Sequence, residues 1–341
     1  MKKLKGVIIG CGRISYRHVQ ALIDNDSFTE LVGLCDIIEE RAIEKQKQYA
    51  ESFPGRNVEV FTDYMEMIKN VKPDFAMICT ESGYHGDIAL HCIEEDLHVL
   101  IEKPMAMTLE EIDKINELAD KKNLKVGVCH QNRFNPPIQK LRKAIDEGKF
   151  GRLINGTARI LWTRDQHYYD LAPWRGTKKL DGGTLMNQCI HNIDLLLWMM
   201  GSDVVSVQSE RGTFLRDIEM EDFGAILLRF ENGSIGIIEG SACVYPKNLE
   251  ETLSIFGETG TAVIGGLAVN EIKTWNFADE SEVIEKEDSS EVKNVYGDGH
   301  TPLLKDFVDA INEDRKPLIC GREARKPVEV ILKAYEQRKL P

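Results

Sequence analysis

A glycine-rich turn near the N-terminus is the feature that most constrains the fold. The apolar stretch from Leu4 to Ile9 predicts a short strand, and an amphipathic helix is expected from about Ser15 to Asp24. Between them, Gly10 permits a tight turn and Gly12 lets the backbone approach a pyrophosphate at the helix N-terminus. Ser15 replaces the third glycine of the dinucleotide-binding fingerprint, and serine is small enough for close helix–strand packing. This context predicts the first βα unit of a Rossmann domain.

The second expected strand, residues 30–35, ends in Asp36, about twenty residues after the fingerprint. A carboxylate at this point accepts both hydroxyls of an adenosine ribose and repels a 2′-phosphate. No basic residue follows Asp36 until Arg41. The sequence therefore favours NAD over NADP. The alternative is that Asp36 only caps the helix expected over residues 39–50.

The alternation of strands and helices continues to Cys129. Further strands are expected at 58–61, 74–79, 97–101 and 125–129. Helices are expected at about 63–69, 85–95 and 108–122, the last opened by a capping box of Thr108 and Glu111. Six strands with intervening helices predict an α/β fold with one doubly wound Rossmann dinucleotide-binding domain over residues 1–129.

The fifth expected strand stops abruptly on Glu102, Lys103 and Pro104. Pro104 removes a ladder donor and keeps Lys103 extended at the carboxyl edge of the sheet. Ligands of open α/β sheets bind at that edge. Lys103 can therefore bind an anion or serve as an acid or base, and the alternative is a solvated loop lysine.

After Cys129 the pattern predicts a second α/β domain, residues 130–341, with a large, mostly antiparallel open sheet. A helix is expected to run to about Glu147, and Asn232-Gly233 predicts a tight hairpin. The free face of such a sheet often becomes a subunit interface, so we expect substrate binding and oligomerisation here, as a homotetramer or homodimer. Strands are expected at 152–163, 204–214, 223–230, 234–244 and 251–256, helices at 301–312 and about 323–338, and a solvated loop or edge at 279–291.

A second cluster of polar residues lies between the first two of these strands. Gly182 and Gly183 open a helix expected to run from Thr184 to Met200, and the two glycines make its first turn closely approachable. Asn187 and His191 are four residues apart, so they are expected to share one face of that helix. We expect His191 and Lys103 to meet across one cleft, over the redox ring of the cofactor. The alternative is that His191 is a core histidine with satisfied hydrogen bonds.

Composition excludes several classes of function. The 341 residues are 42% hydrophobic and 29% charged with a net charge of −13, which is typical of a globular protein and argues against nucleic acid or an anionic membrane as partner. No segment has the length of a membrane span, and the N-terminal apolar stretch is too short for a signal peptide, so a cytoplasmic protein is expected. The eight cysteines form no Cys-x-x-Cys pair and indicate reduced thiols with no bound metal.

Motifs of both halves occur together: Gly10-Cys11-Gly12, Asp36, Glu102-Lys103-Pro104, Gly182-Gly183 and His191-Asn192-Ile193-Asp194. This combination resembles the glucose–fructose oxidoreductase/inositol dehydrogenase (Gfo/Idh/MocA) family over essentially the whole chain. The resemblance implies a pyridine-nucleotide-dependent dehydrogenase of a sugar or cyclitol, with Lys103 and His191 in the catalytic positions. Many members carry an aspartate where this chain has Asn187. Its absence removes a charge that would hold His191 cationic and shifts proton transfer toward Lys103.

Further stretches resemble one subgroup, the UDP-N-acetylglucosaminuronate 3-dehydrogenases (WlbA/WbpB type) of surface-polysaccharide assembly. They are 131–136, 162–170, 174–176, 186–188, 245–250 and 265–271. The resemblance implies NAD-dependent oxidation of the C3 hydroxyl of a nucleotide-sugar uronate. Some members of this subgroup regenerate the cofactor with 2-oxoglutarate, which is therefore a candidate second substrate.

The residue types of the second domain suit that substrate independently of the resemblance. Two phosphates and a carboxylate need fixed cations, and sugar or uracil rings need planar surfaces. The chain supplies both kinds of side chain in Arg159, Arg164, Arg175, Trp162, Tyr168, Tyr169 and Trp174. The alternative is a surface strand and loop with ordinary arginines.

Two sets of site residues follow from the motifs and the resemblance. Expected cofactor contacts are Gly10, Gly12, Arg13, Ile14, Asp36, Thr80, Ser82, His85, Glu102, Lys103, Gln131, Trp174 and Arg175. Expected substrate contacts are Lys103, Arg133, Asn135, Arg164, Tyr168, Tyr169, Arg175, Asn187, Gln188 and His191.

In the expected mechanism Lys103, assisted by His191, removes the proton of the C3 hydroxyl while hydride passes to the nicotinamide. Two other functions remain open: an NAD-dependent dehydrogenase of a free sugar or inositol, and a non-catalytic NAD-binding regulator. The joint presence of Lys103 and His191 argues against the regulator, because a sensor needs neither side chain.

Overall fold

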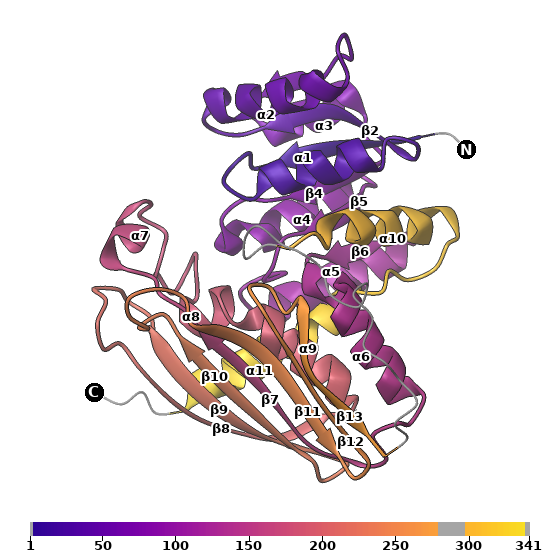
Figure 1. The fold of residues 1–341 in the computed structure, drawn as a ribbon. Helices are drawn as coiled ribbons and strands as arrows, with labels where there is room; N and C mark the ends of the chain where they lie inside the picture. The colour runs from indigo at the N-terminus through magenta and orange to yellow at the C-terminus, as the bar shows by residue number, and fades with distance from the viewer. Residues whose placement is uncertain (1–2, 279–296, 338–341) are drawn as a thin grey trace. The chain divides into compact units, whose positions relative to one another are not determined.

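The computed structural model describes residues 3–278 and 297–337, so the predicted loop at 279–291 lies outside the described residues (Figure 1). Contacts divide the chain into two compact units. The first holds Met1–Cys129 and His300–Arg325, and the second holds His130–Gly299 and Lys326–Pro341.

The first unit is built on a six-stranded parallel sheet, as the sequence predicts. Its strand order is β3-β2-β1-β4-β5-β6. The strands are β1 (Leu4–Ile9), β2 (Thr29–Cys35), β3 (Glu59–Phe61), β4 (Phe75–Ile78), β5 (His98–Ile101) and β6 (Val126–Val128). β4 is buried along its whole length, as expected for a parallel strand with both faces covered. The order confirms the doubly wound Rossmann fold.

The helices of this unit include α1 (Ser15–Asp24), α2 (Glu39–Ser52), α3 (Tyr64–Val71), the 3-10 helix η1 (Ser82–Tyr84), α4 (His85–Glu94) and α5 (Leu109–Lys122). Two of them, α3 and α5, begin at a capping side chain that the sequence contains. The Asp63 side chain accepts from the backbone of Met65 and Glu66 and so caps α3. The capping box of Thr108 and Glu111 opens α5 as predicted.

One later helix belongs to the first unit and not to the second, which corrects the expected domain assignment of its segment. α10 (His300–Asn312) buries Leu303, Leu304, Phe307 and Val308. The Phe307 ring lies 6.0 Å from that of Phe75 on β4, in an edge-to-face arrangement. The apolar face of α10 thus covers the parallel sheet, and residues 300–325 complete its core.

The second unit contains a seven-stranded sheet of order β13-β12-β11-β7-β10-β9-β8. Every neighbouring pair is antiparallel except β10 with β7, which is parallel. The Asn232-Gly233 hairpin is confirmed, with Gly233 at φ 83°. The strands are β7 (Leu153–Leu161), β8 (Val204–Gly212), β9 (Phe223–Phe230), β10 (Ile235–Ser241), β11 (Glu250–Gly257), β12 (Gly260–Gly265) and β13 (Glu271–Phe277). The sequence analysis missed the last two.

Helices cover one face of this sheet. α9 (Ile190–Met200) packs on β7 and β11. A Cβ on Gly156 of β7 would lie 2.6 Å from Leu196 Cδ1, so that glycine allows the close approach. The other helical segments of the unit are η2 (Gln131–Phe134), α6 (Pro136–Asp146), α7 (Gln166–Asp170), α8 (Gly183–Asn187) and α11 (Gly321–Glu336), whose first residues belong to the first unit. α11 begins before Pro327 and runs through it, so the proline does not delay the helix.

The long helix predicted from Thr184 to Met200 is two helices in the structure. α8 ends at Asn187 and α9 begins at Ile190, so Asn187 and His191 do not share a helical face, and that prediction is wrong. The Thr184 carbonyl accepts from the backbone N–H groups of both Gln188 and Cys189. Cys189 then packs so tightly on β10 that a Cβ on Gly240 would lie 2.4 Å from its sulfur. This contact with the sheet redirects the chain between the two helices.

Candidate active site

The glycine-rich turn has the geometry that a dinucleotide requires. Gly10 has φ 92°, and a Cβ there would lie 2.7 Å from the backbone of Cys79 and Thr80. A Cβ on Gly12 would meet nothing within 4 Å, so open space lies beside the Gly12 backbone. The Ser15 hydroxyl donates to the Gly12 carbonyl at 2.7 Å and fixes the start of α1. Arg13 is exposed and Ile14 half-buried beside this space.

Asp36 holds the glycine-rich turn to the end of β2. Its Oδ2 accepts the Cys11 N–H at 2.8 Å, and its Oδ1 accepts the Ile38 N–H at 2.9 Å. Ile38 occupies the N-cap of α2, so Asp36 is not the capping residue of that helix. The Arg41 guanidinium lies 3.9 Å from Asp36 Oδ1. The carboxylate is thus fixed at the strand end where an adenosine ribose binds in Rossmann folds.

Replacing Asp36 by serine is expected to raise the kcat/KM ratio of NADP to NAD by about tenfold, because repulsion of the 2′-phosphate disappears while Arg41 remains. Parallel steady-state assays with both cofactors measure the ratio. Adding Arg41→Gln to Asp36→Ser should remove the gain. An unchanged ratio in Asp36→Ser would show that this carboxylate does not select the cofactor.

His85 braces two loops at the carboxyl edge of the parallel sheet. Its Nδ1 lies 2.8 Å from the Pro104 carbonyl oxygen, and its Nε2 lies 3.0 Å from the Thr80 carbonyl oxygen. Burial lowers the pKa of His85. Ser82 is also buried and opens η1 beside it. These residues shape the loops that follow β4 and β5, and their direct contact with a cofactor stays a prediction.

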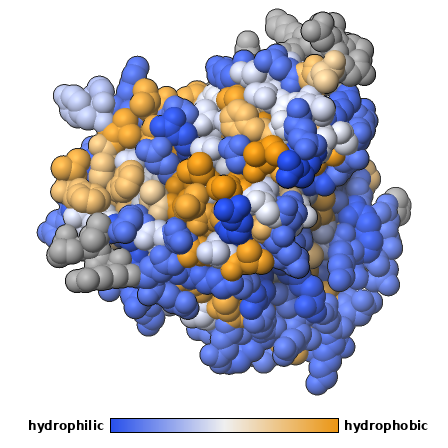
Figure 2. Space-filling model, turned by 90° about the horizontal axis from the view of Figure 1, so that it is seen from below, coloured by the Kyte–Doolittle hydropathy of each residue, from blue (hydrophilic) through white to orange (hydrophobic). Residues whose placement is uncertain are grey.

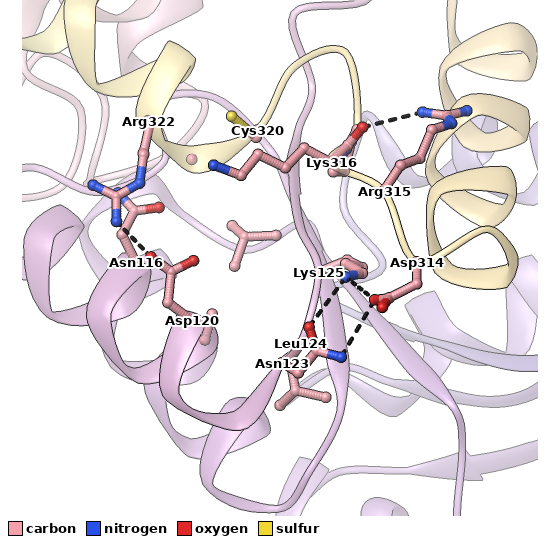
Figure 3. Close-up of a pocket in the computed structure, with 14 residues that line it drawn as sticks. Asn116, Asp120, Asn123, Leu124, Lys125, Asp314, Arg315, Lys316, Cys320 and Arg322 are labelled. Atoms are coloured by element: carbon pink, nitrogen blue, oxygen red, sulfur yellow. Dashed lines mark hydrogen bonds and ion pairs between the residues drawn. The ribbon is translucent and has the colours of Figure 1, made fainter.

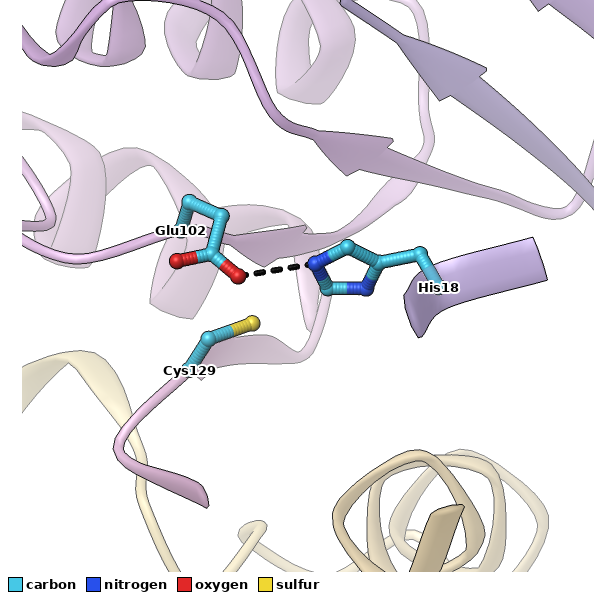
Figure 4. A group of neighbouring side chains, drawn as sticks. All are labelled: His18, Glu102 and Cys129. Carbon is cyan, nitrogen blue, oxygen red and sulfur yellow. Dashed lines mark hydrogen bonds and ion pairs between the residues drawn. The ribbon is translucent and has the colours of Figure 1, made fainter. Parts of the chain in front are cut away.

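Lys103 follows β5 as predicted, and the Lys103–Pro104 bond is cis. Its backbone N–H donates to Glu102 Oε2 at 3.2 Å. The other oxygen of this buried carboxylate, Oε1, lies 2.8 Å from His18 Nε2 (Figure 4). The sequence analysis missed His18. The available signal was a histidine on the buried face of α1, beside Val19 and Leu22.

Two of the expected substrate residues contact other parts of the second unit, and their contact with a substrate stays a prediction. Arg133 donates to Asp194 through Nε at 2.7 Å and Nη2 at 2.6 Å, and its guanidinium lies 4.8 Å from the centre of the Trp198 ring. Asn135 donates to the Ala268 carbonyl at 2.7 Å. Arg133 and Asp194 are 2% and 0% exposed, so this is a buried ion pair. Gln131, an expected cofactor contact, is also buried.

Two arginines flank one tyrosine ring of the second unit. The guanidinium carbons of Arg164 and Arg175 lie 5.3 Å and 4.1 Å from the centre of the Tyr168 ring. Arg164 also lies over Trp162, and Arg175 over Trp174. Arg164 donates to the Thr163 carbonyl and to Asn248, and the charge of Arg164 acts on the buried carboxyl of Glu251. Within residues 3–278 and 297–337, no carboxylate oxygen forms an ion pair within 4 Å of either guanidinium group. The structure thus brings together cationic and aromatic groups that the sequence analysis selected.

Two other expected substrate residues contact Tyr168. Gln188 donates to the Tyr168 hydroxyl at 3.1 Å, and the Tyr169 ring packs edge-on against Tyr168 at 5.1 Å. Arg159, a further arginine of the second unit, instead pairs with Glu239 at 2.9 Å and Glu250 at 3.5 Å on the sheet.

The Asn187 side chain donates to Asp181, a buried carboxylate that the sequence analysis did not select. Asp181 also accepts the Gly176 N–H at 2.6 Å. A carboxylate therefore lies directly beside Asn187. His191 is half-buried, and its ring packs edge-on against His130 at 5.6 Å.

Glu221 is a further residue that sequence reasoning missed. It is fully buried, and its Oε1 accepts the Leu185 N–H at 2.8 Å and the Tyr335 hydroxyl at 2.9 Å. The Tyr335 hydroxyl is also within hydrogen-bond reach of the Gly182 carbonyl, so its single proton lies between two acceptor oxygens. Burial raises the pKa of Glu221 to about 7. Glu221 and Tyr335 thus hold the paired glycines that open α8.

A separate pocket of the first unit contains none of the expected site residues (Figure 3). It lies between α5 and the segment that joins α10 to α11. Its charged lining is largely self-neutralised, because Lys125 pairs with Asp314 at 2.6 Å and Arg322 pairs with Asp120.

The two units match two family models. Residues 4–130 match an oxidoreductase family with an NAD-binding Rossmann fold, and residues 138–263 match the GFO/IDH/MocA C-terminal domain. The chain belongs to the GFO/IDH/MocA oxidoreductase family. It is an NAD-dependent dehydrogenase that acts on CH–OH groups, and its first unit is the NAD-binding domain. Among the described residues, no helix of this GFO/IDH/MocA protein is long and apolar enough to cross a bilayer.

Two solved structures and one relative of known activity each match nearly the whole chain. The WlbA dehydrogenase of Bordetella pertussis, solved with NADH and UDP-GlcNAcA, is 33% identical with a TM-score of 0.87, and the match covers 98% of this chain and 96% of that one. The WlbA dehydrogenase of Chromobacterium violaceum, solved with the same two ligands, is 35% identical with a TM-score of 0.86, over 98% and 94% of the two chains. The myo-inositol 2-dehydrogenase of Thermotoga maritima is 24% identical over 93% of this chain and 91% of the relative.

Proposed function

We propose that this protein oxidises the C3 hydroxyl of UDP-N-acetylglucosaminuronic acid to the 3-keto sugar with NAD, in nucleotide-sugar synthesis for a surface polysaccharide. The observation that carries the proposal is the group formed by Arg164, Arg175 and Tyr168. The two guanidinium groups lie on the faces of one ring and form no close carboxylate pair among the described residues, so they suit phosphate and carboxylate oxygens, and the rings beside them suit a sugar or base. The two WlbA dehydrogenases, which were solved with UDP-GlcNAcA, support the same substrate class.

The mechanism assigns proton transfer to Lys103, with His191 assisting. Gly10, Gly12 and Asp36 would hold NAD, because the turn leaves space beside Gly12 and fixes the carboxylate at the strand end. Bound NAD supplies the hydride acceptor. Lys103 removes the hydroxyl proton in its neutral form, and the loops braced by His85 and Glu102 fix its backbone. Asn187 and its partner Asp181 hold the chain before His191.

The direct experiment follows absorbance of reduced cofactor when the purified protein is mixed with NAD and either UDP-N-acetylglucosaminuronic acid or myo-inositol. We expect NADH only with the nucleotide sugar. NADH only with myo-inositol would favour the second candidate function, a free-sugar or inositol dehydrogenase, which the Thermotoga maritima relative supports. NAD binding without turnover of any sugar would favour a regulator. Adding 2-oxoglutarate after turnover tests whether it reoxidises the cofactor.

Arg164→Gln and Arg175→Gln are each expected to raise the KM for the nucleotide sugar by about 10- to 100-fold, because each removes a charge-assisted contact with an anion. The KM for NAD should change little. Arg159→Gln is the matched control, since Arg159 is neutralised by Glu239 and Glu250. An equal effect of all three changes would contradict the assignment of the two arginines to the substrate.

We also propose that a second copy of the chain covers the exposed face of the seven-stranded sheet. Leu227 and Ile237 are paired across β9 and β10 and are 46% and 42% exposed. Figure 2 shows apolar side chains gathered on one face of the molecule. Ile237→Lys should shift the protein to a smaller assembly in sedimentation velocity, because burying an unpaired ammonium is costly. An unchanged sedimentation coefficient would place the interface elsewhere.

A further inference from the structure

Three buried polar groups of the first unit surround Glu102, and Figure 4 shows two of them, His18 and Cys129. His18 of α1, Cys129 after β6 and His300 of α10 are at most 4% exposed, and Glu102 is 6% exposed. His18 Nε2 lies 2.8 Å from Glu102 Oε1, and His300 Nε2 lies 3.9 Å from the same oxygen. The donor atoms of His18, Glu102 and Cys129 all lie within 4.8 Å of one another. The carboxylate is the centre of the cluster.

The contacts describe a hydrogen-bond network. His18 Nε2 is at hydrogen-bond distance from Oε1, and Oε2 accepts the Lys103 N–H at 3.2 Å. Each oxygen of Glu102 therefore has its own partner. Burial and the charge of Glu102 raise the pKa of the neighbouring Cys129 thiol well above its ordinary value.

The network keeps a buried negative charge next to Lys103. Burial alone would raise the pKa of Glu102, but the hydrogen bond and charge of His18, with His300 and Lys103, hold it well below its ordinary value. Burial and the charge of His18 lower the pKa of His300 to about 3, so His300 is neutral near pH 7. A charge in this position favours the ammonium form of a neighbouring lysine.

We propose that His18 is a positioning residue for Lys103, acting through Glu102, and that the Glu102 carboxylate sets the pH range in which Lys103 works. The inference rests on the proposed function, in which Lys103 is the base. His18 lies on the helix that begins at the glycine-rich turn, so one carboxylate joins that helix to the backbone of Lys103. The titratable and charged groups around Glu102 and its partners are His18, Arg17, Cys79, His85, Lys103, Cys129 and His300.

The first test is the pH profile of kcat for Glu102→Gln, which keeps the shape and removes the charge. The neutral amine should form at lower pH, so the acidic limb should move down by about 1 pH unit. Asp26→Asn is the matched control, because Asp26 is a carboxylate of the same unit that pairs with Lys3 and Arg56. The acidic limb of the pH profile of kcat should not move in this variant. A lower melting temperature or kcat in Glu102→Gln with an unmoved limb would mean that the carboxylate is only structural.

The second test compares His18→Leu with His18→Gln. Leucine has no donor, and kcat should fall by about tenfold with an unchanged KM, because Lys103 loses its fixed position. The glutamine amide can donate to Glu102, so His18→Gln should restore most of the lost kcat. Equal losses in the two variants would overturn the positioning role.

The third test needs no sugar substrate. Competitive acetylation with acetic anhydride, read by peptide mass spectrometry across pH, measures the pKa of the Lys103 amine in the NAD-bound protein. The pKa should be lower by about 1 unit in Glu102→Gln. If the pKa of Lys103 shifts but the protein turns over no nucleotide sugar, the proposed function is refuted and this inference stands. If the protein turns over the nucleotide sugar fully but the pKa of Lys103 does not shift, the proposed function stands and this inference is refuted.

Discussion

Replacing Lys103 by alanine is expected to lower kcat by about 10³-fold, because a positioned general base contributes about 10²–10⁴-fold to proton transfer. The affinity for NAD should stay nearly unchanged, since the expected grip on the cofactor lies in the glycine-rich turn and Asp36. Steady-state NADH formation measures the first quantity, and fluorescence titration measures the second.

Lys114→Ala is the matched control for this prediction. Lys114 is an exposed lysine of the same unit that pairs with Glu110 at 2.8 Å on α5. It should leave both turnover and NAD affinity unchanged. Normal turnover in Lys103→Ala would remove Lys103 from the mechanism, whereas loss of NAD binding would make it a cofactor contact and not the base.

Replacing Arg133 by methionine should lower the free energy of unfolding by about 3–5 kcal/mol, because Asp194 would remain buried without its partner. Both side chains are almost inaccessible to solvent, and the pair is bidentate. Urea denaturation followed by circular dichroism measures the loss. If Arg133 instead contacted the substrate, the change would raise KM and leave stability intact.

Two further variants sharpen this second prediction. Arg152→Met breaks an exposed pair with Glu258 in the same unit and should cost at most about 1 kcal/mol. The double variant Arg133→Met with Asp194→Leu removes both buried charges and should recover much of the stability that the single variant loses. Additive losses in the double variant would show that the two side chains do not act as a pair.

The sequence predicted the parallel sheet well because its signals are local. Buried strands are apolar along their length, and caps such as Thr108 act within a few residues. Asp36 and Lys103 were found for the same reason, since each lies within two residues of the end of a strand. The carboxyl ends of parallel strands meet at one edge, so position in the chain was enough to place them there.

The features that the sequence did not reveal are contacts between residues far apart in the chain. Arg133 has the residue type of an anion binder, and only the fold brings Asp194 against it. The break between α8 and α9 has no glycine or proline to mark it, because it is set by Cys189 against Gly240 of β10. The apolar face of α10 was visible in the sequence, but not the fact that Phe75 is its partner.

The hydroxyl of Tyr335 contacts Gly182 and Glu221, yet Tyr335 lies only six residues before the end of the chain. The last turn of α11 thus holds the loop at Gly182 in place, although the two segments are more than a hundred positions apart in the chain. Deletion of the chain from Tyr335 onward would therefore loosen the loop at Gly182 and the start of α8, while every residue of the first unit stays in place.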